Sequence, residues 1–294
     1  MIPEGRFAPT PSGKLHFGSL STAVGSYIHA RSRNGFWHLR IEDIDTIRCK
    51  QEYSDDILFT LEKFGFTWDG PVIYQSQRSS IYQDALSTLK AHNYIYGSIC
   101  TRAEIKASDG NHPQFCRKRN LPISAKTGIR FKLDDTPLSF FDERCGTIKQ
   151  QANVFSLGSK DFLLKRHDGI WCYNLASVID DIETNINEVV RGEDLLENTF
   201  DQIALIQAEH GTVPNYCHLP LVMEGNGKKL SKQNHAPTVD TNKINELLAA
   251  ALKFLGQKIP EEYMEMSGEE ILYYAAKNFS LKNLPLYQKK KIFS

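Results

Sequence analysis

The first part of the chain alternates between strand-like and helix-like patterns of apolar residues. Trp37, Leu39 and Ile41 alternate with polar residues, which is typical of a strand. Leu20 and Val24 begin a series at the spacing of one helix face. The alternation predicts βαβ units on a parallel sheet. The predicted elements are a strand at 6–8, a helix from about 20 to 33, a strand at 37–41, a helix from about 57 to 64 and a helix at 79–92.

The pattern changes after residue 95. Residues 96–127 contain Gly, Pro, Asn, a Cys/His group and many basic side chains, and we predict an insertion there. After residue 240 apolar residues again recur at helical spacing, so the C-terminal region is expected to be mainly helical. Between these regions we predict strands at 129–133 and 161–166, a strand at 189–190, a helix ending near 210 and a strand near 218–223.

Composition narrows the class of protein. The 294 residues are 41% hydrophobic and 24% charged, which is ordinary globular usage and excludes a disordered chain, a collagen and a coiled coil. No apolar run approaches the roughly 18 residues of a membrane span. The first ten residues lack the apolar centre of a signal peptide, and the six cysteines are expected to be reduced thiols or metal ligands. We therefore expect a cytoplasmic protein; the sequence leaves the oligomeric state open, and we favour a monomer.

The formal net charge of zero conceals two oppositely charged segments. Residues 102–132 carry eight basic side chains against Glu104 and Asp109, whereas residues 180–201 carry eight acidic ones against Arg191 alone. The basic segment is a candidate contact for an RNA backbone, although such a run is more often simply solvated.

Two segments have the composition of phosphate-binding loops. The first, Ala8 to Leu20, runs from a predicted strand into a predicted helix and contains His16 and Gly18. A helix N-terminus offers unpaired N–H groups and a positive dipole end to phosphate. The second, Gly225 to Gln233, combines glycines with the cations Lys229 and Lys232. Each is weak evidence alone, but the pair in this order on an α/β chain is a much stronger signal.

With these motifs the sequence resembles the class I aminoacyl-tRNA synthetases. HFGS matches the HIGH signature and KLSKQ the KMSKS signature of that family. The segments RFAPTPSGKLHFGSL, LRIEDID, WDGPVIYQSQR, YNLASVIDD, VVRGEDLL and KLSKQNHAP are similar to the glutamyl-tRNA synthetase core, and the HFGSL and LSKQNHAP variants to the shortened glutamyl-queuosine tRNA(Asp) synthetases. The resemblance covers roughly residues 3–240. It implies an α/β fold with a Rossmann-like parallel-sheet core.

The resemblance also implies an activity and a set of site residues. Glutamate would be activated by ATP with Mg²⁺ to glutamyl-adenylate and then transferred to tRNA. His16, Gly18 and Lys232 would be catalytic, and these three with Lys229 and Ser231 would bind ATP. The residues implied to bind glutamate are Arg6, Phe7, Ala8, Pro9, Thr10, Ser12, Glu42, Tyr173 and Arg191. From the residues alone, ion pairing of Arg191 with its acidic neighbours is the favoured explanation.

A metal site is expected in the insertion. Short relatives carry Cys-x-Cys, Tyr and Cys there as zinc ligands, and the matching positions are Ser98, Cys100, His112 and Cys116. Cysteine and histidine are good zinc ligands, but Ser98 is a poor fourth one. The alternative is two unligated cysteines near a surface histidine.

The division of the chain bears on the tRNA substrate. The resemblance implies a first half of the core at 1–95, the insertion at 96–127, a second half with the KLSKQ loop at 128–240 and a helical region at 241–294. Only 62 residues follow Lys232, too few for the helical anticodon-binding region of a complete glutamyl-tRNA synthetase. The implied acceptor is therefore the queuosine wobble nucleoside of tRNA(Asp). A truncated synthetase that charges a tRNA 3′ end and a non-catalytic RNA-binding regulator are the alternatives.

Overall fold

The computed structural model of the chain describes residues 2–101, 103–104, 116–119, 121–133, 136–150, 161–223 and 237–287. Its centre is a seven-stranded sheet with the strand order β3-β2-β1-β9-β10-β6-β7. Neighbouring strands run parallel from β3 to β6, whereas β6 and β7 form an antiparallel hairpin. The strands are β1 (Glu4–Phe7), β2 (Phe36–Ile41), β3 (Ile73–Tyr74), β6 (Ser139–Asp142), β7 (Gly146–Lys149), β9 (Glu188–Gly192) and β10 (Asn215–Leu219).

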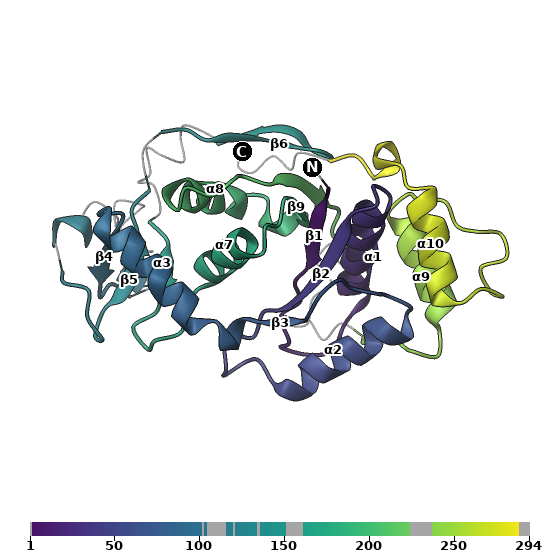
Figure 1. Cartoon of the computed structure of the whole chain (residues 1–294), viewed down its shortest axis with the longest axis horizontal. Helices are drawn as coiled ribbons and strands as arrows, with labels where there is room; N and C mark the ends of the chain where they lie inside the picture. Colours follow the sequence, from purple (N-terminus) through teal and green to yellow (C-terminus); the bar gives the residue numbers. More distant parts are fainter. Residues whose placement is uncertain are drawn as a thin grey trace.

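Helices surround this sheet and extend the molecule at one end (Figure 1). Helices α9 and α10 pack against α1, which in turn packs against β1, β2 and β9. The predicted α/β class with a helical C-terminal part is confirmed. The helices are α1 (Phe17–Arg31), α2 (Gln51–Lys63), α3 (Ser79–Ala91), α7 (Tyr173–Glu183), α8 (Asn198–Ala208), α9 (Ile244–Phe254) and α10 (Gly268–Lys277).

A second, smaller sheet lies at the opposite end of the molecule from α9 and α10 (Figure 1). It is antiparallel, in the order β4-β5-β8, with β4 (Ile95–Ser98), β5 (Gly128–Phe131) and β8 (Leu163–Lys165). The strands predicted at 129–133 and 161–166 are therefore present, but they belong to this small sheet and not to the central one: β5 pairs with both β4 and β8. The strand predicted near 218–223 lies three residues earlier, at Asn215–Leu219, and the β6–β7 hairpin was not predicted.

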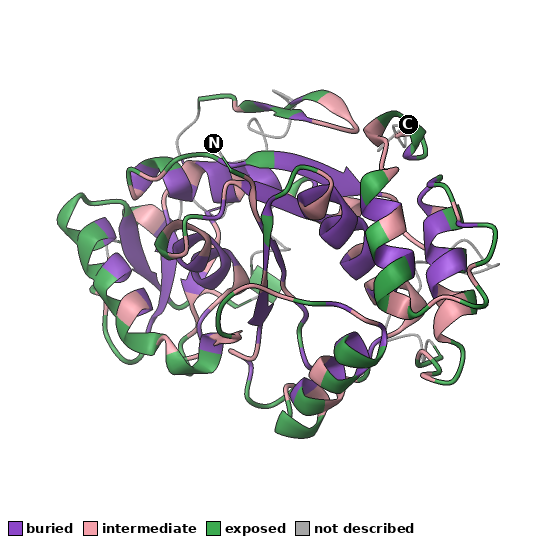
Figure 2. Ribbon diagram, turned by 45° about the vertical axis from the view of Figure 1, so that its right-hand side comes forward, coloured by how far each residue is buried: buried purple, intermediate pink, exposed green. Residues whose placement is uncertain are grey.

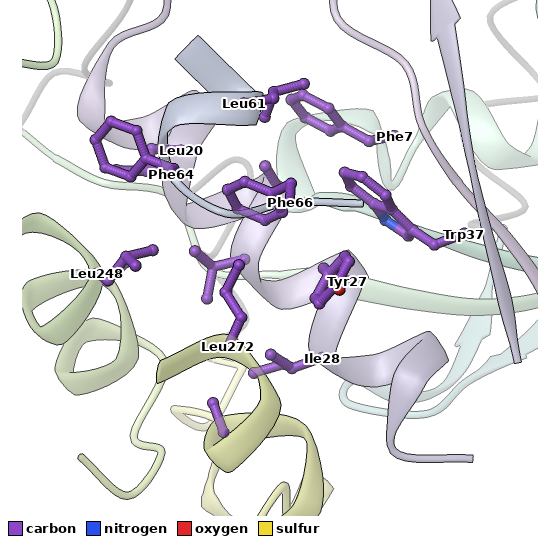
Figure 3. Close-up of a cluster of buried hydrophobic side chains, with 14 of the residues drawn as sticks. Phe7, Leu20, Tyr27, Ile28, Trp37, Leu61, Phe64, Phe66, Leu248 and Leu272 are labelled. Atoms are coloured by element: carbon purple, nitrogen blue, oxygen red, sulfur yellow. The ribbon is translucent and has the colours of Figure 1, made fainter. Parts of the chain in front are cut away.

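Aromatic and aliphatic side chains hold α1 between the sheet and the C-terminal helices (Figure 3). The rings of Tyr27 and Trp37 meet edge to face with centroids 5.0 Å apart, and Phe66 completes the cluster 5.6 Å from Trp37. Leu248 and Leu272 contribute from α9 and α10. Buried residues lie on the inner faces of the helices and along β1, β2, β9 and β10, the strands in the middle of the central sheet (Figure 2). No helix in the ranges given above is long and apolar enough to cross a lipid bilayer.

Candidate active site

A cavity of about 610 Å³ opens where the strand order reverses between β1 and β9. In open α/β sheets ligands bind outside the carboxyl ends of the strands at such a point. Lining residues come from the carboxyl ends of β1, β2, β9 and β10 and from the first turns of α1 and α7. Among the expected site residues, those that line this cavity are Arg6, Phe7, Ala8, Pro9, Thr10, Ser12, His16, Gly18, Glu42, Tyr173 and Arg191.

The N-terminus of α1 faces this cavity. His16 is its N-cap residue, with extended backbone angles, and its Nδ1 accepts the backbone N–H of Ser19 at 3.2 Å. Gly18 and Thr22 also line the cavity from this end of the helix. The arrangement aims the positive end of the helix dipole into the cavity, which favours a phosphate group there. Lys229, Ser231 and Lys232 of the second phosphate loop lie outside the described residues.

Arg191, at the carboxyl end of β9, is a buried cation held by neutral groups. Its Nη1 donates to Gln202 Oε1 at 2.7 Å, its Nη2 to Thr199 Oγ1 at 2.8 Å and its Nε to His218 Nε2 at 3.2 Å. Its side chain is 4% exposed, and the described part of the chain holds no carboxylate within 4.0 Å of it.

Several acidic neighbours of Arg191 in sequence pair with other arginines. Asp180 binds Arg78, Glu188 binds Arg33, and Glu193 binds Arg144. The alternative explanation of Arg191 by ion pairing in its acidic segment is therefore wrong for the residues described. A buried guanidinium with no carboxylate in contact favours an anionic ligand at this point of the cavity.

Arg6 and Glu42 belong to a second, charged network beside Arg191. Asp181 accepts hydrogen bonds from Arg6 Nε at 3.1 Å and from Arg40 Nη1 at 2.6 Å, and Arg40 Nη2 reaches Glu42 Oε1 at 3.4 Å. Burial raises the pKa of Glu42, against the opposing effect of Arg40 and Arg6. A buried carboxylate that lines the cavity gains from an additional cation, so Glu42 suits an ammonium group of a ligand.

Sequence reasoning missed the residues that support the site from behind. Asp181, Arg40, His218 and Asp142 touch the expected ligand-binding side chains or each other but were assigned no role. Asp181 and Arg40 stand inside the motifs YNLASVIDD and LRIEDID, which gave a sequence signal for them. Nothing local connects Asp142 with His218, which is 76 residues further along the chain.

Comparisons with known proteins decide the family. The family model for class I tRNA synthetases (E and Q), catalytic domain, matches residues 4–292. The chain belongs to this family. Similar relatives are the glutamyl-Q tRNA(Asp) synthetases of Photobacterium profundum, 46% identical over 96% of this chain and 89% of the relative, and of Yersinia pestis, 44% identical over 96% and 87%. The relative from Vibrio cholerae, with the same name, is 41% identical over 96% of this chain and 91% of its own length.

Solved structures agree on the class I fold. A glutamate tRNA ligase from Elizabethkingia meningosepticum, crystallised with its amino acid, superposes with a TM-score of 0.75 at 24% identity and covers 97% of this chain. The ligase from Elizabethkingia anophelis gives a TM-score of 0.74 at 24% identity. This synthetase chain spans 66% of the length of each of these two proteins.

Three of the four expected zinc-ligand positions of the synthetase lie together at the end of β4 in the small sheet. Cys100 Sγ and Cys116 Sγ lie 3.4 Å apart, and Ser98 Oγ lies 3.1 Å from Cys116 Sγ. The fold thus brings together two thiols and the serine, which fits half of a tetrahedral zinc site. Arg130 Nε donates a hydrogen bond to Ser98 Oγ at 3.2 Å, so the hydroxyl group that would have to serve as a zinc ligand already has a partner. His112 falls outside the described ranges, and zinc remains a prediction.

Another group of possible metal ligands lies elsewhere in the synthetase. His29, Glu143 and Cys217 bring one ligand atom each within 4.8 Å of one another. Arg33 Nη2, however, lies 2.7 Å from His29 Nδ1 and 2.9 Å from its Nε2, and its Nη1 lies 3.4 Å from Glu143 Oε1. The guanidinium already supplies the positive charge of this cluster, so the arrangement does not favour a metal ion.

Three basic residues of the segment 102–132 are engaged inside the synthetase. Arg117 forms an ion pair with the buried Asp161, Arg130 donates to the carbonyl oxygen of Asp161 at 2.6 Å, and Lys132 Nζ donates to Asn93 at 2.7 Å. These three cations stabilise the small sheet. They contribute less to an RNA-binding surface than the sequence count suggests.

Proposed function

We propose that this chain activates L-glutamate with ATP and transfers it to the queuosine wobble nucleoside of tRNA(Asp). The observation that carries the amino-acid part is Arg191, a buried cation at a cavity wall that lacks a carboxylate partner among the described residues. An amino acid with a second carboxylate supplies the missing charge. Relatives 41–46% identical over 96% of this chain are named glutamyl-Q tRNA(Asp) synthetase, which supports this acceptor.

Glutamate would be held by opposite charges at its two ends. Arg191 and Arg6 provide guanidinium groups for a carboxylate, and such charge-assisted bonds are stronger than neutral ones. Glu42 would accept a hydrogen bond from the α-ammonium group. Tyr173 would close the wall beside Arg191, and its hydroxyl oxygen accepts a hydrogen bond from Arg191 Nη1 at 3.3 Å. Phe7, Ala8, Pro9, Thr10 and Ser12 form another part of the cavity wall.

Activation joins this pocket to the N-terminus of α1. A carboxylate oxygen of glutamate attacks the α-phosphorus of ATP, the acyl–phosphate bond forms, and the bond to pyrophosphate breaks. His16 and Gly18 would receive the phosphates there, and Lys229, Ser231 and Lys232 would complete the site. The chemistry is mainly positioning and stabilisation of phosphoryl charge, with Mg²⁺ accompanying ATP. A hydroxyl group of the tRNA nucleoside then attacks the carbonyl carbon, and AMP leaves.

Glutamate-dependent exchange of pyrophosphate into ATP tests the activation step. The wild type is expected to exchange with tRNA(Asp) present, and Arg191→Gln should raise the glutamate KM about 100-fold with little change in the ATP KM. Arg48→Gln, at a side chain 67% exposed, is the matched control. Lys232→Ala should lower the activation rate far more than it weakens glutamate binding. Absence of exchange in the wild type would favour a binding protein without chemistry.

Transfer of labelled glutamate tests the acceptor. tRNA(Asp) containing queuosine should be charged, and tRNA(Asp) with unmodified guanosine at the wobble position should not. Equal charging of both would contradict the queuosine proposal and favour a 3′ end as acceptor. Because the proposed reaction uses tRNA and ATP, we also propose the cytoplasm as its compartment.

A further inference from the structure

Behind Arg191 lies a fully buried pair formed by Asp142 and His218. Asp142 ends β6 and His218 lies in β10, and both side chains are 0% exposed. Asp142 Oδ2 accepts the backbone N–H of His218 at 3.0 Å and lies 2.7 Å from its Nδ1. The other oxygen, Oδ1, accepts the backbone N–H groups of Arg144 at 3.0 Å and Cys145 at 2.8 Å. The β6–β7 turn therefore fixes Asp142, and Asp142 fixes the imidazole.

The two hydrogen-bond partners of the His218 ring determine its tautomer. A carboxylate cannot donate, so Nδ1 carries the proton that Asp142 accepts. The Nε–H of Arg191 can only donate, so His218 Nε2, 3.2 Å away, must present its lone pair. The contacts at both ring nitrogens are therefore consistent with a neutral imidazole that carries its hydrogen on Nδ1. Burial lowers the pKa of His218, against the opposing bond to Asp142, in keeping with a neutral ring.

The bonds of Arg191 fall into two sets. Its three anchoring bonds, of 2.7–3.2 Å, go to Gln202, Thr199 and His218. Two longer contacts, from Nη1 to Tyr173 at 3.3 Å and from Nη2 to Leu195 O at 3.5 Å, go to residues that line the cavity. A carboxylate in the cavity can replace these two weak contacts and receive one N–H from each Nη atom.

We propose that Asp142 and His218 position Arg191 for the substrate carboxylate, and that Asp142 serves as its distant counter-charge. A carboxylate in direct contact with Arg191 would neutralise it and occupy the N–H groups that the substrate needs. With the imidazole in between, Asp142 stabilises the buried cation while both Nη groups remain turned towards the cavity wall. The pair consists of positioning residues, and this inference rests on the proposed glutamate-binding role of the cavity.

Two substitutions at His218 separate its bonds. In His218→Gln the amide oxygen can still accept from Arg191 Nε, whereas in His218→Asn the amide can still donate to Asp142 but is too short to reach Arg191. In pyrophosphate exchange we expect His218→Asn to raise the glutamate KM about 10-fold or more, with His218→Gln much closer to the wild type. The ATP KM should change by less than about 2-fold in both.

Two readouts distinguish positioning from a merely structural role. In an Arg191→Lys background, His218→Asn should add little to the glutamate KM, because its effect passes through the guanidinium. The ¹⁵N shifts of the wild-type ring should show a protonated Nδ1 and a bare Nε2 at pH 7, a measurement that needs no variant to fold. Additive effects of the two substitutions, or an Nε2–H tautomer, would overturn the inference. Wild-type exchange activity is tested separately, and its absence would instead defeat the proposed function.

Discussion

Asp181, in the last turn of α7, binds Arg6 of β1 across 175 residues of sequence, with Oδ1 3.1 Å from the arginine Nε. The same carboxylate receives Arg40 Nη1 at 2.6 Å, so one acidic group orders two buried cations at the edge of the cavity. The fixed position of Arg6 in the cavity wall is thus a property of α7 as much as of β1.

Asp181→Asn should destabilise the protein by about 3 kcal/mol at pH 7, because it leaves two buried guanidinium groups with too little negative charge. Burial raises the pKa of Asp181, but Arg40 and Arg6 outweigh it and hold that pKa below the ordinary value. The contribution is therefore present above the unfolded pKa, about 3.9, and is lost as the pH falls through the lower folded value. Urea unfolding from pH 7 to pH 3 should show the two proteins converging in acid.

The control for this prediction is Asp168→Asn, which breaks an exposed pair with Arg166. It should change the free energy of unfolding little, since solvent screens exposed ion pairs. An equal loss of unfolding free energy in both variants would show that burial does not make the Arg6–Asp181 pair more stabilising than an exposed pair.

Glu42→Gln should raise the glutamate KM about 10–100-fold, because a buried carboxylate at the cavity wall would lose its bond to the α-ammonium group. The ATP KM should stay near the wild-type value. Asp43→Asn is the neighbouring control, because the Asp43 carboxylate is bonded to Ser76. Measured KM values that rise equally in both variants would remove Glu42 from the site.

Glu209→Gln should stabilise the protein at alkaline pH. Burial raises the pKa of Glu209 to about 7, and its Oε1 has no hydrogen-bond partner in the described part of the chain. Between the unfolded pKa and pH 7, Glu209 is ionised in the unfolded state but still protonated in the folded state. The free energy of unfolding therefore falls as the pH rises through this range. We expect a gain of about 1–2 kcal/mol at pH 8 and almost none at pH 4.5 in urea unfolding. A gain of equal size at both pH values would contradict this cause.

Gly25→Ala should destabilise the contact of α1 with β10 and with the segment after α9. A Cβ at Gly25 would lie 2.5 Å from Leu219 Cδ1 and 3.4 Å from Leu255 Cδ1, inside a filled core. The expected loss in thermal or urea unfolding is about 1–3 kcal/mol. Gly5→Ala makes the same change where the new Cβ meets Ala30 Cβ at 3.4 Å, and should be tolerated. Comparable losses in both would show that space at Gly25 is not the constraint.

Zinc analysis of protein purified without a histidine tag tests the expected metal site. About one equivalent per chain is predicted, and Cys100→Ser should reduce it, since the two thiols are the best ligands that the fold brings together. Less than about a tenth of an equivalent in the wild type would end the zinc prediction.

Where helices and strands carry a regular apolar pattern, the sequence alone predicted them. The spacing of Leu20, Val24 and their neighbours gave α1, and the alternation of Trp37, Leu39 and Ile41 gave β2. The hairpin β6–β7 was missed because β6 has only four residues and reverses the rule: Phe141 is 66% exposed whereas Asp142 is fully buried. A pattern of hydrophobicity cannot reveal a strand whose inward residue is a carboxylate.

The candidate site, too, was predicted in part from the sequence and determined in part by the tertiary structure. By itself the sequence determined the ordered motifs, and hence the residues of the cavity wall, because each motif is a local run of the chain. The tertiary structure decided what those residues can do: that Arg191 has no carboxylate beside it in the described structure, that Asp181 orders Arg6, and that Asp142 reaches Arg191 through His218. These relationships join residues 27–175 positions apart, and the free energy of a buried charge depends on such neighbours and not on the adjacent sequence.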